Sequence, residues 1–332
     1  MRTWVEKVIA DKKRVAMPVM THPGIELIGK SVLQAITDGE VHHQAIMALN
    51  EKYPSAASTV IMDLTVEAEA FGAKIIFNDD EIATVNGSML KDELDIETLE
   101  VPDLNEGRVQ EYLKANRLTA EKITDKPVFA GCIGPFSLAG RLYDMSEMLM
   151  LPYLNPDAAI QLLDKCTEFI YTYCQALKDT GVSGVIMAEP AAGLLDDDTC
   201  QAFSSDFIKR IVNAVQDDYF AVILHDCGNK GNCTKATVSV GAMGYHFGNA
   251  IDLPTAAKEV PADALVMGNL DPSGLFRMGT PETMKSATLT LLDKMKAFPN
   301  FILSSGCDTP PHSPFANIDA FYEALDEYNA NL

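Results

Sequence analysis

Residues 221–228 read AVILHDCG, and this stretch decides the fold class. Its apolar residues follow one another without alternation and end in a polar cluster with a glycine. Continuous hydrophobicity of this length is typical of a strand buried on both faces, as in a parallel sheet covered by helices. Seven further short apolar runs end in a Gly, Pro, Asp or Thr cluster: 14–21 (RVAMPVMT), 58–65 (STVIMDLT), 127–134 (PVFAGCIG), 183–190 (SGVIMAEP), 243–248 (MGYHFG), 264–271 (ALVMGNLD) and 301–308 (FILSSGCD).

Helical patterns separate several of these runs and follow the last one. The clearest span 156–180, 198–215, 281–297 and 314–328. Asn155 and Thr280 are suitable N-caps, each followed by a proline at the first helical position. Eight strands that alternate with helices predict an α/β fold of the (β/α)8 TIM-barrel type rather than an open sheet. We therefore expect a single TIM-barrel domain over residues 1–332.

One segment departs from this alternation of strands and helices. Residues 73–94 (AKIIFNDDEIATVNGSMLKDEL) alternate apolar and polar side chains and contain the turn signal Asn86-Gly87. Alternation combined with an Asn-Gly pair is typical of a β-hairpin. We expect a small hairpin inserted after the second barrel strand.

The chain is strongly acidic but otherwise has the composition of a globular protein. Among its 332 residues, 26 Lys and Arg stand against 47 Asp and Glu, so the formal net charge is −21. Such a charge disfavours binding to nucleic acid through its phosphates. No run approaches the ~20 apolar residues of a membrane span, and the first residues lack the pattern of a signal peptide. We expect a cytoplasmic protein whose seven cysteines are mostly reduced.

Polar residues gather at the predicted strand ends, where the chemistry of a TIM barrel is located. Three of the six histidines fall there. The strand-end candidates are His22, Asp63, Cys132, Glu189, His225, Asp226, Cys227, His246, Asn249, Asn269, Asp271, Cys307 and Asp308. Two further acids, Glu67 and Glu69, are expected to face solvent or the N-terminus of their own helix.

The sharpest pattern combines His225 and Cys227 with Cys307. Residues two apart on a strand point to the same face, so His225 and Cys227 are expected side by side. A third soft ligand from Cys307 completes a nitrogen and sulfur set that suits zinc and leaves one position open. Two other interpretations stay open: His225 and Cys227 belong to an ordinary core, or Cys233 forms a local loop site with Cys227.

Five ordered blocks of sequence resemble one protein family. They are MDLTVEAEAFG (62–72), GPFSLAGRL (134–142), ILHDCGN (223–229), GNLDP (268–272) with GTPE (279–282), and SSGCDTPPHSPFANIDAF (304–321). They resemble the uroporphyrinogen decarboxylase superfamily, and within it the zinc-dependent corrinoid methyltransferases of the methylcobamide:coenzyme M type. The resemblance implies a (β/α)8 barrel and carries the zinc motif of that branch onto His225, Cys227 and Cys307. The segment 17–29 (MPVMTHPGIELIG) lacks the arginines with which the decarboxylases hold substrate carboxylates.

The resemblance also implies a mechanism, a cofactor and a partner. A zinc-bound thiolate, formed from a small thiol such as coenzyme M, attacks the methyl group of a methyl-corrinoid (methylcobamide) that a separate corrinoid protein carries. The fourth zinc ligand is expected to be His246, with Asp252 as the alternative. Substrate contacts are expected from four strand-end residues, Glu189, His22, Asp63 and Asn249.

Other functions remain open on the same fold. A lyase that decarboxylates a tetrapyrrole needs a basic pocket and no metal. A corrinoid methyltransferase can instead use tetrahydrofolate as the acceptor, although methylation at nitrogen gains nothing from a thiolate. A non-catalytic corrinoid-binding protein would keep the barrel without the zinc.

Overall fold

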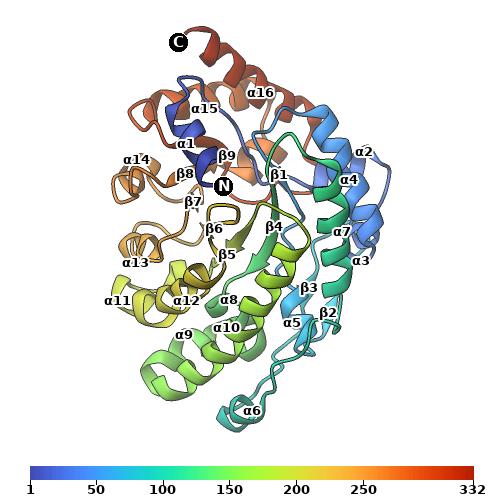
Figure 1. Ribbon diagram of the computed structural model, residues 1–332, viewed down its shortest axis with the longest axis vertical. Coiled ribbons are helices and arrows are strands. Elements are labelled where there is room, and N and C mark those ends of the chain that lie inside the picture. The colour runs from blue at the N-terminus through green and yellow to red at the C-terminus, as the bar shows by residue number, and fades with distance from the viewer.

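The computed structural model describes residues 1–332 as a curled parallel sheet surrounded by helices (Figure 1). Seven strands form this sheet in the order β1-β4-β5-β6-β7-β8-β9. They are β1 (Ser58–Thr59), β4 (Val128–Ile133), β5 (Gly184–Ala188), β6 (Ala221–Asp226), β7 (Gly244–Phe247), β8 (Leu265–Leu270) and β9 (Phe301–Ser305). Each lies within one of the eight predicted runs.

The remaining run, near the N-terminus, takes the place of the eighth strand. Ala16 forms a parallel bridge with Leu303 of β9, and the amide of Met17 donates to the Leu303 carbonyl at 2.9 Å. On its other side, the Ala16 carbonyl accepts from the amide of Ala56 at 2.8 Å, just before β1. The segment therefore closes the sheet between β9 and β1, which confirms the TIM-barrel prediction.

Helices cover the outside of the barrel. The longer ones are α1 (Arg2–Ala10), α4 (Gly39–Lys52), α7 (Val109–Lys122), α8 (Pro135–Tyr143), α9 (Met145–Leu154), α10 (Pro156–Asp179), α12 (Asp206–Val215), α15 (Pro281–Lys294) and α16 (Phe315–Ala330). The shorter ones are α2 (His22–Leu27), α3 (Val32–Thr37), α5 (Val66–Ala70), α6 (Glu93–Thr98), α11 (Asp197–Cys200), α13 (Thr234–Val238) and α14 (Leu253–Ala257). One 3-10 turn, η1 (Ala192–Leu194), and two π-helical turns, η2 (Gln201–Ser205) and η3 (Pro272–Arg277), complete the elements. None of the helices combines the length and the apolar character that crossing a membrane requires.

The predicted helices form for the expected reasons. The side chain of Asn155 caps α10 by accepting from the amide of Ala158 at 3.2 Å. Thr280 and Thr283 form a capping box at the start of α15. The expected helix over 198–215 is interrupted by the π-helical turn η2, between α11 and α12.

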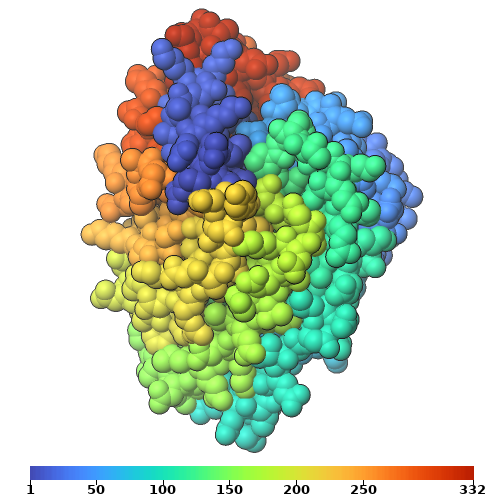
Figure 2. Space-filling model, in the orientation of Figure 1, coloured from blue at the N-terminus to red at the C-terminus, as the bar shows by residue number.

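Helix α1 closes the barrel at the end where the strands begin. Val5 is buried in the cluster of apolar side chains that fills the barrel interior, together with Phe129 and Met243. The ring of Trp4 lies 5.9 Å from that of Phe129. In Figure 2 this N-terminal segment, in dark blue, lies across the face shown. Helix α1 therefore covers the end where the strands begin, and the opposite end, where the strands finish, is not covered by it.

A β-hairpin follows the second barrel strand, as predicted. Its strands are β2 (Ile75–Ile76) and β3 (Thr84–Val85), paired antiparallel. The connecting loop is 77–83, so the expectation that Asn86-Gly87 forms the turn is wrong. Gly87 has a φ of 73° and instead supplies the left-handed conformation with which the chain leaves the hairpin after β3.

A buried ion pair connects the segment after β1 to the start of α7. One oxygen of Asp63 accepts from the amide and hydroxyl of Thr65 at 2.9 and 2.6 Å. The other accepts from Arg108 Nη1 at 2.5 Å and from the Tyr112 hydroxyl at 3.0 Å. Arg108 also donates to Glu69 at 2.6 Å. Both oxygens of Asp63 are thus fully used within the protein, in place of the predicted contact with substrate.

Replacing Arg108 by Met should therefore lower the free energy of unfolding by about 3 kcal/mol, because it leaves the Asp63 carboxylate buried without its cation. Unfolding in urea measures this change. The matched control is Arg210→Met, since Arg210 pairs with Asp164 but keeps 57% of its side chain exposed. That variant should lose less than about 1 kcal/mol. Equal losses in the two variants would contradict the role given to Arg108.

Candidate metal centre

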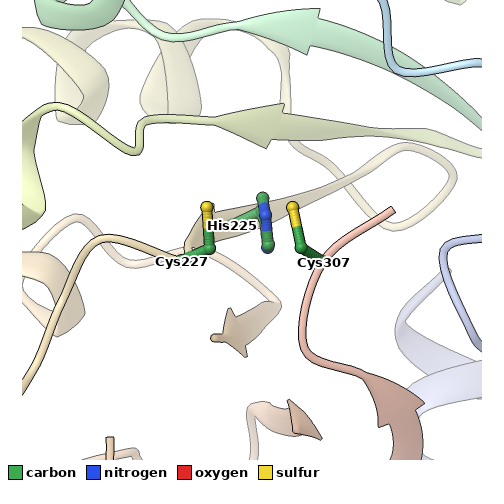
Figure 3. Close-up of side chains that lie close together, drawn as sticks. All are labelled: His225, Cys227 and Cys307. Atoms are coloured by element: carbon green, nitrogen blue, oxygen red, sulfur yellow. The ribbon is translucent and has the colours of Figure 1, made fainter. Parts of the chain in front are cut away.

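Three side chains converge at the open end of the barrel. His225 is the penultimate residue of β6, Cys227 follows that strand directly, and Cys307 lies two residues beyond β9. One ligand atom from each lies within 4.8 Å of the others. Figure 3 shows the imidazole between the two sulfur atoms, with Cys307 arriving from a separate segment of chain. The structure thus brings together the three residues that the sequence pattern predicted.

The period of the strand selects which side chains enter this group. His225 and Cys227 share one side, and Asp226 between them points away. The Asp226 carboxylate accepts from the hydroxyl of Thr237 in α13 at 3.1 Å, and Cys233 Sγ lies 3.7 Å from the same oxygen. Burial raises the pKa of Asp226 to about 6. Cys233 therefore packs behind the strand, which argues against the local loop site.

Two glycines allow the ligand-bearing segments to approach one another. A side chain at Gly248, after β7, would lie 2.6 Å from the carbonyl oxygen of Cys227. A side chain at Gly306 would lie 2.7 Å from the amide nitrogen of Asn249. Both distances are shorter than van der Waals contact, so only glycine fits at these two positions beside the cysteines.

The three residues fit a zinc ion in their donor types and in their burial. His225 is buried, and its Nε2 atom has no hydrogen-bond partner, which is costly unless a ligand occupies it. Cys227 and Cys307 are both half-buried, so the sulfur side of the group faces the open end of the barrel. One nitrogen and two sulfur donors with a free position match the ligand sets of catalytic zinc sites.

Electrostatics within the group favour a thiolate. Hydrogen bonding from Cys227 and the proximity of His225 lower the pKa of Cys307 below its ordinary value. The same contact, together with burial, raises the pKa of Cys227. Burial disfavours the charged form of His225, but the Cys307 thiolate outweighs it and raises the pKa of the imidazole. A metal that binds here would displace the proton that Cys227 holds in its absence.

His246, the expected fourth ligand, lies beside the group rather than within it. Its Nδ1 is 2.7 Å from Nδ1 of His225, and its Nε2 is 2.8 Å from the hydroxyl of Ser304. Burial and the neighbouring His225 lower its pKa well below the usual range. With both ring nitrogens in hydrogen bonds, His246 contacts a ligand residue and has no nitrogen free for the metal. Asp252, the alternative, caps α14 through the amide of Thr255 at 3.2 Å.

The carboxylate of Glu189 binds the N-terminus of helix α8. Its two oxygens accept from the amides of Phe136 at 3.0 Å and Ser137 at 2.5 Å, at the N-terminus of α8. Burial raises its pKa to about 7. Both oxygens are therefore occupied, and the predicted contact of Glu189 with substrate would require α8 to give up its cap.

The other two predicted substrate residues lie near the metal group. His22, at the start of α2, is buried with its Nδ1 3.3 Å from the carboxylate of Asp308, the residue after Cys307. Burial disfavours its charged form, but Asp308 outweighs this and raises the pKa of His22. Asn249 is exposed, and its backbone packs against Gly306. His22 and Asn249 thus lie next to the residues that follow and precede Cys307 in the chain.

The sequence did not predict the contacts of two buried residues, Ser304 and Glu67. Ser304 was not among the predicted site residues, although a hydroxyl within the apolar strand β9 indicates a buried hydrogen-bond partner. Glu67 was expected to face solvent or its helix N-terminus, yet it is fully buried and accepts from the amide of Ile133 at 2.9 Å. Burial raises its pKa to about 7. The contact with β4 pairs residues far apart in sequence, which no local pattern reveals.

Fold and side chains together define a TIM-barrel protein with a candidate thiolate metal centre at the carboxyl ends of its strands. The sequence profile of the family described as uroporphyrinogen decarboxylase (URO-D) matches residues 7–328. The chain belongs to this family, which confirms the resemblance found in the sequence.

Relatives from two branches of the family are similar to this chain. A protein named methylcobamide:CoM methyltransferase MtbA, from Methanosarcina acetivorans, is 30% identical over 276 residues, which is 82% of this chain and 80% of the relative. A uroporphyrinogen decarboxylase from Chlorobium limicola is 28% identical over 267 residues, 75% of this chain and 72% of the relative. A solved structure of a methyltransferase from Methanosarcina mazei superimposes with a TM-score of 0.88 over 98% of both chains at 23% identity, which supports the fold.

The metal centre can be tested by removing one cysteine at a time. The unmodified protein should copurify with zinc, and the Cys307→Ala variant should not, because two ligands hold the ion far less tightly than three. The matched control is Cys233→Ala, which removes a buried thiol near Asp226 but leaves the group intact. Metal analysis of the purified proteins measures the content. Trace zinc in the unmodified protein, or equal zinc in Cys307→Ala, would exclude this centre.

Glu67 should make stability depend on pH. Its folded pKa of about 7 lies above the ordinary value of 4.5, so the folded state binds more protons between these pH values and stability falls as pH rises through them. Glu67→Gln removes this dependence. Between pH 4.5 and pH 8, the unmodified protein should lose about 3 kcal/mol of unfolding free energy relative to the Glu67→Gln variant. A difference independent of pH would contradict the burial of an ionisable Glu67.

Proposed function

We propose that this protein transfers a methyl group from a methyl-corrinoid to a small thiol activated at a zinc ion, which His225, Cys227 and Cys307 would hold. The observation that carries the proposal is the group itself: three soft ligand atoms within 4.8 Å, buried on the histidine side and open on the sulfur side. The name of the Methanosarcina acetivorans relative, methylcobamide:CoM methyltransferase, supports the same reaction.

The chemistry requires a thiolate at neutral pH. A free thiol has a pKa near ~8.5 and is mostly protonated, and zinc when bound would supply the positive charge that removes this proton. A lone pair of the substrate sulfur then forms a bond to the methyl carbon while the cobalt–carbon bond breaks. The electron pair of that bond stays on the metal of the corrinoid, giving Co(I) and a thioether. His225 and the two cysteines contribute by fixing the position of the sulfur relative to the barrel mouth.

The acceptor in this proposal is coenzyme M, as in the name of the relative. A thiol acceptor accounts for a sulfur-rich metal group, whereas tetrahydrofolate would not need one. Homocysteine and other small thiols share the reacting group with coenzyme M. An experiment has to decide which of these thiols is the methyl acceptor.

The methyl donor in this proposal is a corrinoid protein that docks over the barrel mouth. Segments that follow β1, β5 and β8 in the chain expose large apolar side chains, including Phe77, Ile82, Leu194 and Met278. Exposed apolar side chains of this size suit contact with a protein partner. With a formal net charge of −21, the chain would favour a partner whose facing surface is neutral or basic. The seven unpaired cysteines suit a reducing compartment, so we place the reaction in the cytoplasm.

The second candidate is a decarboxylase acting on a tetrapyrrole, supported by the name of the Chlorobium limicola relative. Such a substrate needs cations for its carboxylates. The segment 17–29 contains no arginine, and its only histidine, His22, is paired with Asp308. This arrangement favours the methyltransferase.

A methylcobalamin assay with a panel of acceptors tests the proposal. The zinc-loaded protein should convert methylcobalamin to reduced cobalamin, followed by absorbance, with coenzyme M faster than homocysteine and with no reaction of tetrahydrofolate. Cys307→Ala should fall to the rate without protein, whereas Cys233→Ala should keep its activity. Decarboxylation of uroporphyrinogen without methyl transfer would establish the second candidate. Binding of methylcobalamin without turnover by any acceptor would point to a non-catalytic protein.

A further inference from the structure

Three hydrogen bonds connect the barrel closure to the metal group. The Nδ1 atoms of His225 and His246 lie 2.7 Å apart. The Nε2 atom of His246 lies 2.8 Å from the hydroxyl oxygen of Ser304, and that hydroxyl lies 2.8 Å from the carbonyl oxygen of Met17. His246 and Ser304 are completely buried, so solvent does not compete for these bonds.

The Met17 carbonyl determines which atom is the donor in each of these three hydrogen bonds. A carbonyl oxygen can only accept, so the single proton of Ser304 is donated to Met17. Ser304 must then accept from Nε2–H of His246. A neutral His246 with its proton on Nε2 has a lone pair on Nδ1, which accepts from Nδ1–H of His225. The other ring nitrogen of His225, Nε2, is buried without a hydrogen-bond partner, so it is the nitrogen left free for a metal shared with Cys227 and Cys307.

We propose that Ser304 and His246 are positioning residues that fix the proton of His225 on Nδ1 and thereby present its Nε2 to the metal. His246 then acts through His225 instead of serving as a fourth ligand. The identity of the metal rests on the proposed function, but the proton positions do not depend on methyl transfer.

Removing the Ser304 hydroxyl should change the positions of the protons on His246 and His225. Without an acceptor for Nε2–H, His246 gains by moving its proton to Nδ1, where it donates to His225. His225 must then accept on Nδ1 and hold its own proton on Nε2, which blocks the ligand position. Partners that orient a metal-binding histidine are typically worth 10–100-fold in metal affinity.

Zinc affinity, measured by competition with a chelator, tests this consequence. Ser304→Ala should bind zinc about 10-fold or more weakly than the unmodified protein. The matched control is Ser305→Ala, because Ser305 is equally buried on the same strand but its hydroxyl contacts only Val19, at 3.2 Å from the amide and 3.5 Å from the carbonyl. Ser305→Ala should bind zinc normally. Equal affinities of the two variants would overturn the proposal.

A second pair of variants separates orientation from simple packing. His246→Asn keeps an acceptor near the position of Nδ1 and should retain most of the zinc affinity. His246→Leu fills the space without an acceptor and should lose at least as much affinity as Ser304→Ala. If His246→Asn and His246→Leu bind zinc with similar affinity, His246 affects zinc binding through packing alone.

Nitrogen-15 spectra of histidine-labelled protein give a readout that does not involve activity. In the unmodified protein, His225 should carry its proton on Nδ1 and His246 on Nε2, and Ser304→Ala should shift His246 toward the Nδ1 form. The opposite assignment in the unmodified protein would overturn the proposal. If that protein bound no zinc, the proposed function would fail. The same spectra of the metal-free protein would still decide the proton positions.

Discussion

Backbone pairing between β9 and the segment 15–19 is the constraint on which both the barrel and its metal group depend. It closes the sheet through the hydrogen bond from Met17 to Leu303. By holding β9 in place, it delivers Cys307 to the rim where β6 delivers His225 and Cys227. The same pairing places the Met17 carbonyl against the hydroxyl of Ser304. Closure of the fold and orientation of the metal group therefore rest on one set of contacts.

The sequence predicts those features that depend on local pattern. Continuous apolar runs identify strands buried on both faces, and the period of two places His225 beside Cys227. Because parallel strands share one direction, all their carboxyl ends meet at one rim, and this brings in Cys307. These physical rules predict the barrel and place His225, Cys227 and Cys307 at one rim, but the family resemblance was needed to choose these three residues over an ordinary core or a loop site with Cys233.

What the sequence does not reveal are the partners of polar side chains, because these come from distant parts of the chain. Asp63 is neutralised by Arg108, Glu189 is used by the N-terminus of α8, and His246 is turned toward Ser304 across the intervening strand β8. A carboxylate at a strand end has the same local sequence whether it meets a substrate or an arginine. Only the packing of the helices decides between the two.

The acidic composition also has a different meaning once the fold is known. The formal charge of −21 counts every carboxylate as ionised. Burial raises the pKa of Glu67 and Glu189 to about 7, so each carries only part of a negative charge at that pH. The excess of negative charge therefore lies mainly on the outside of the protein. Charge of this kind acts on approaching partners more than on the chemistry inside the barrel.

The two sides of the metal group differ in how freely they can rearrange. On the histidine side, His225 is buried and its Nδ1 is held by His246. On the sulfur side, Cys227 and Cys307 are half-buried and border the open end of the barrel. If a metal bound here as proposed, its ligands would differ in freedom. Buried hydrogen bonds would hold His225 in place, whereas Cys227 and Cys307, which border the open end, would be the ligands able to shift when a thiol arrives.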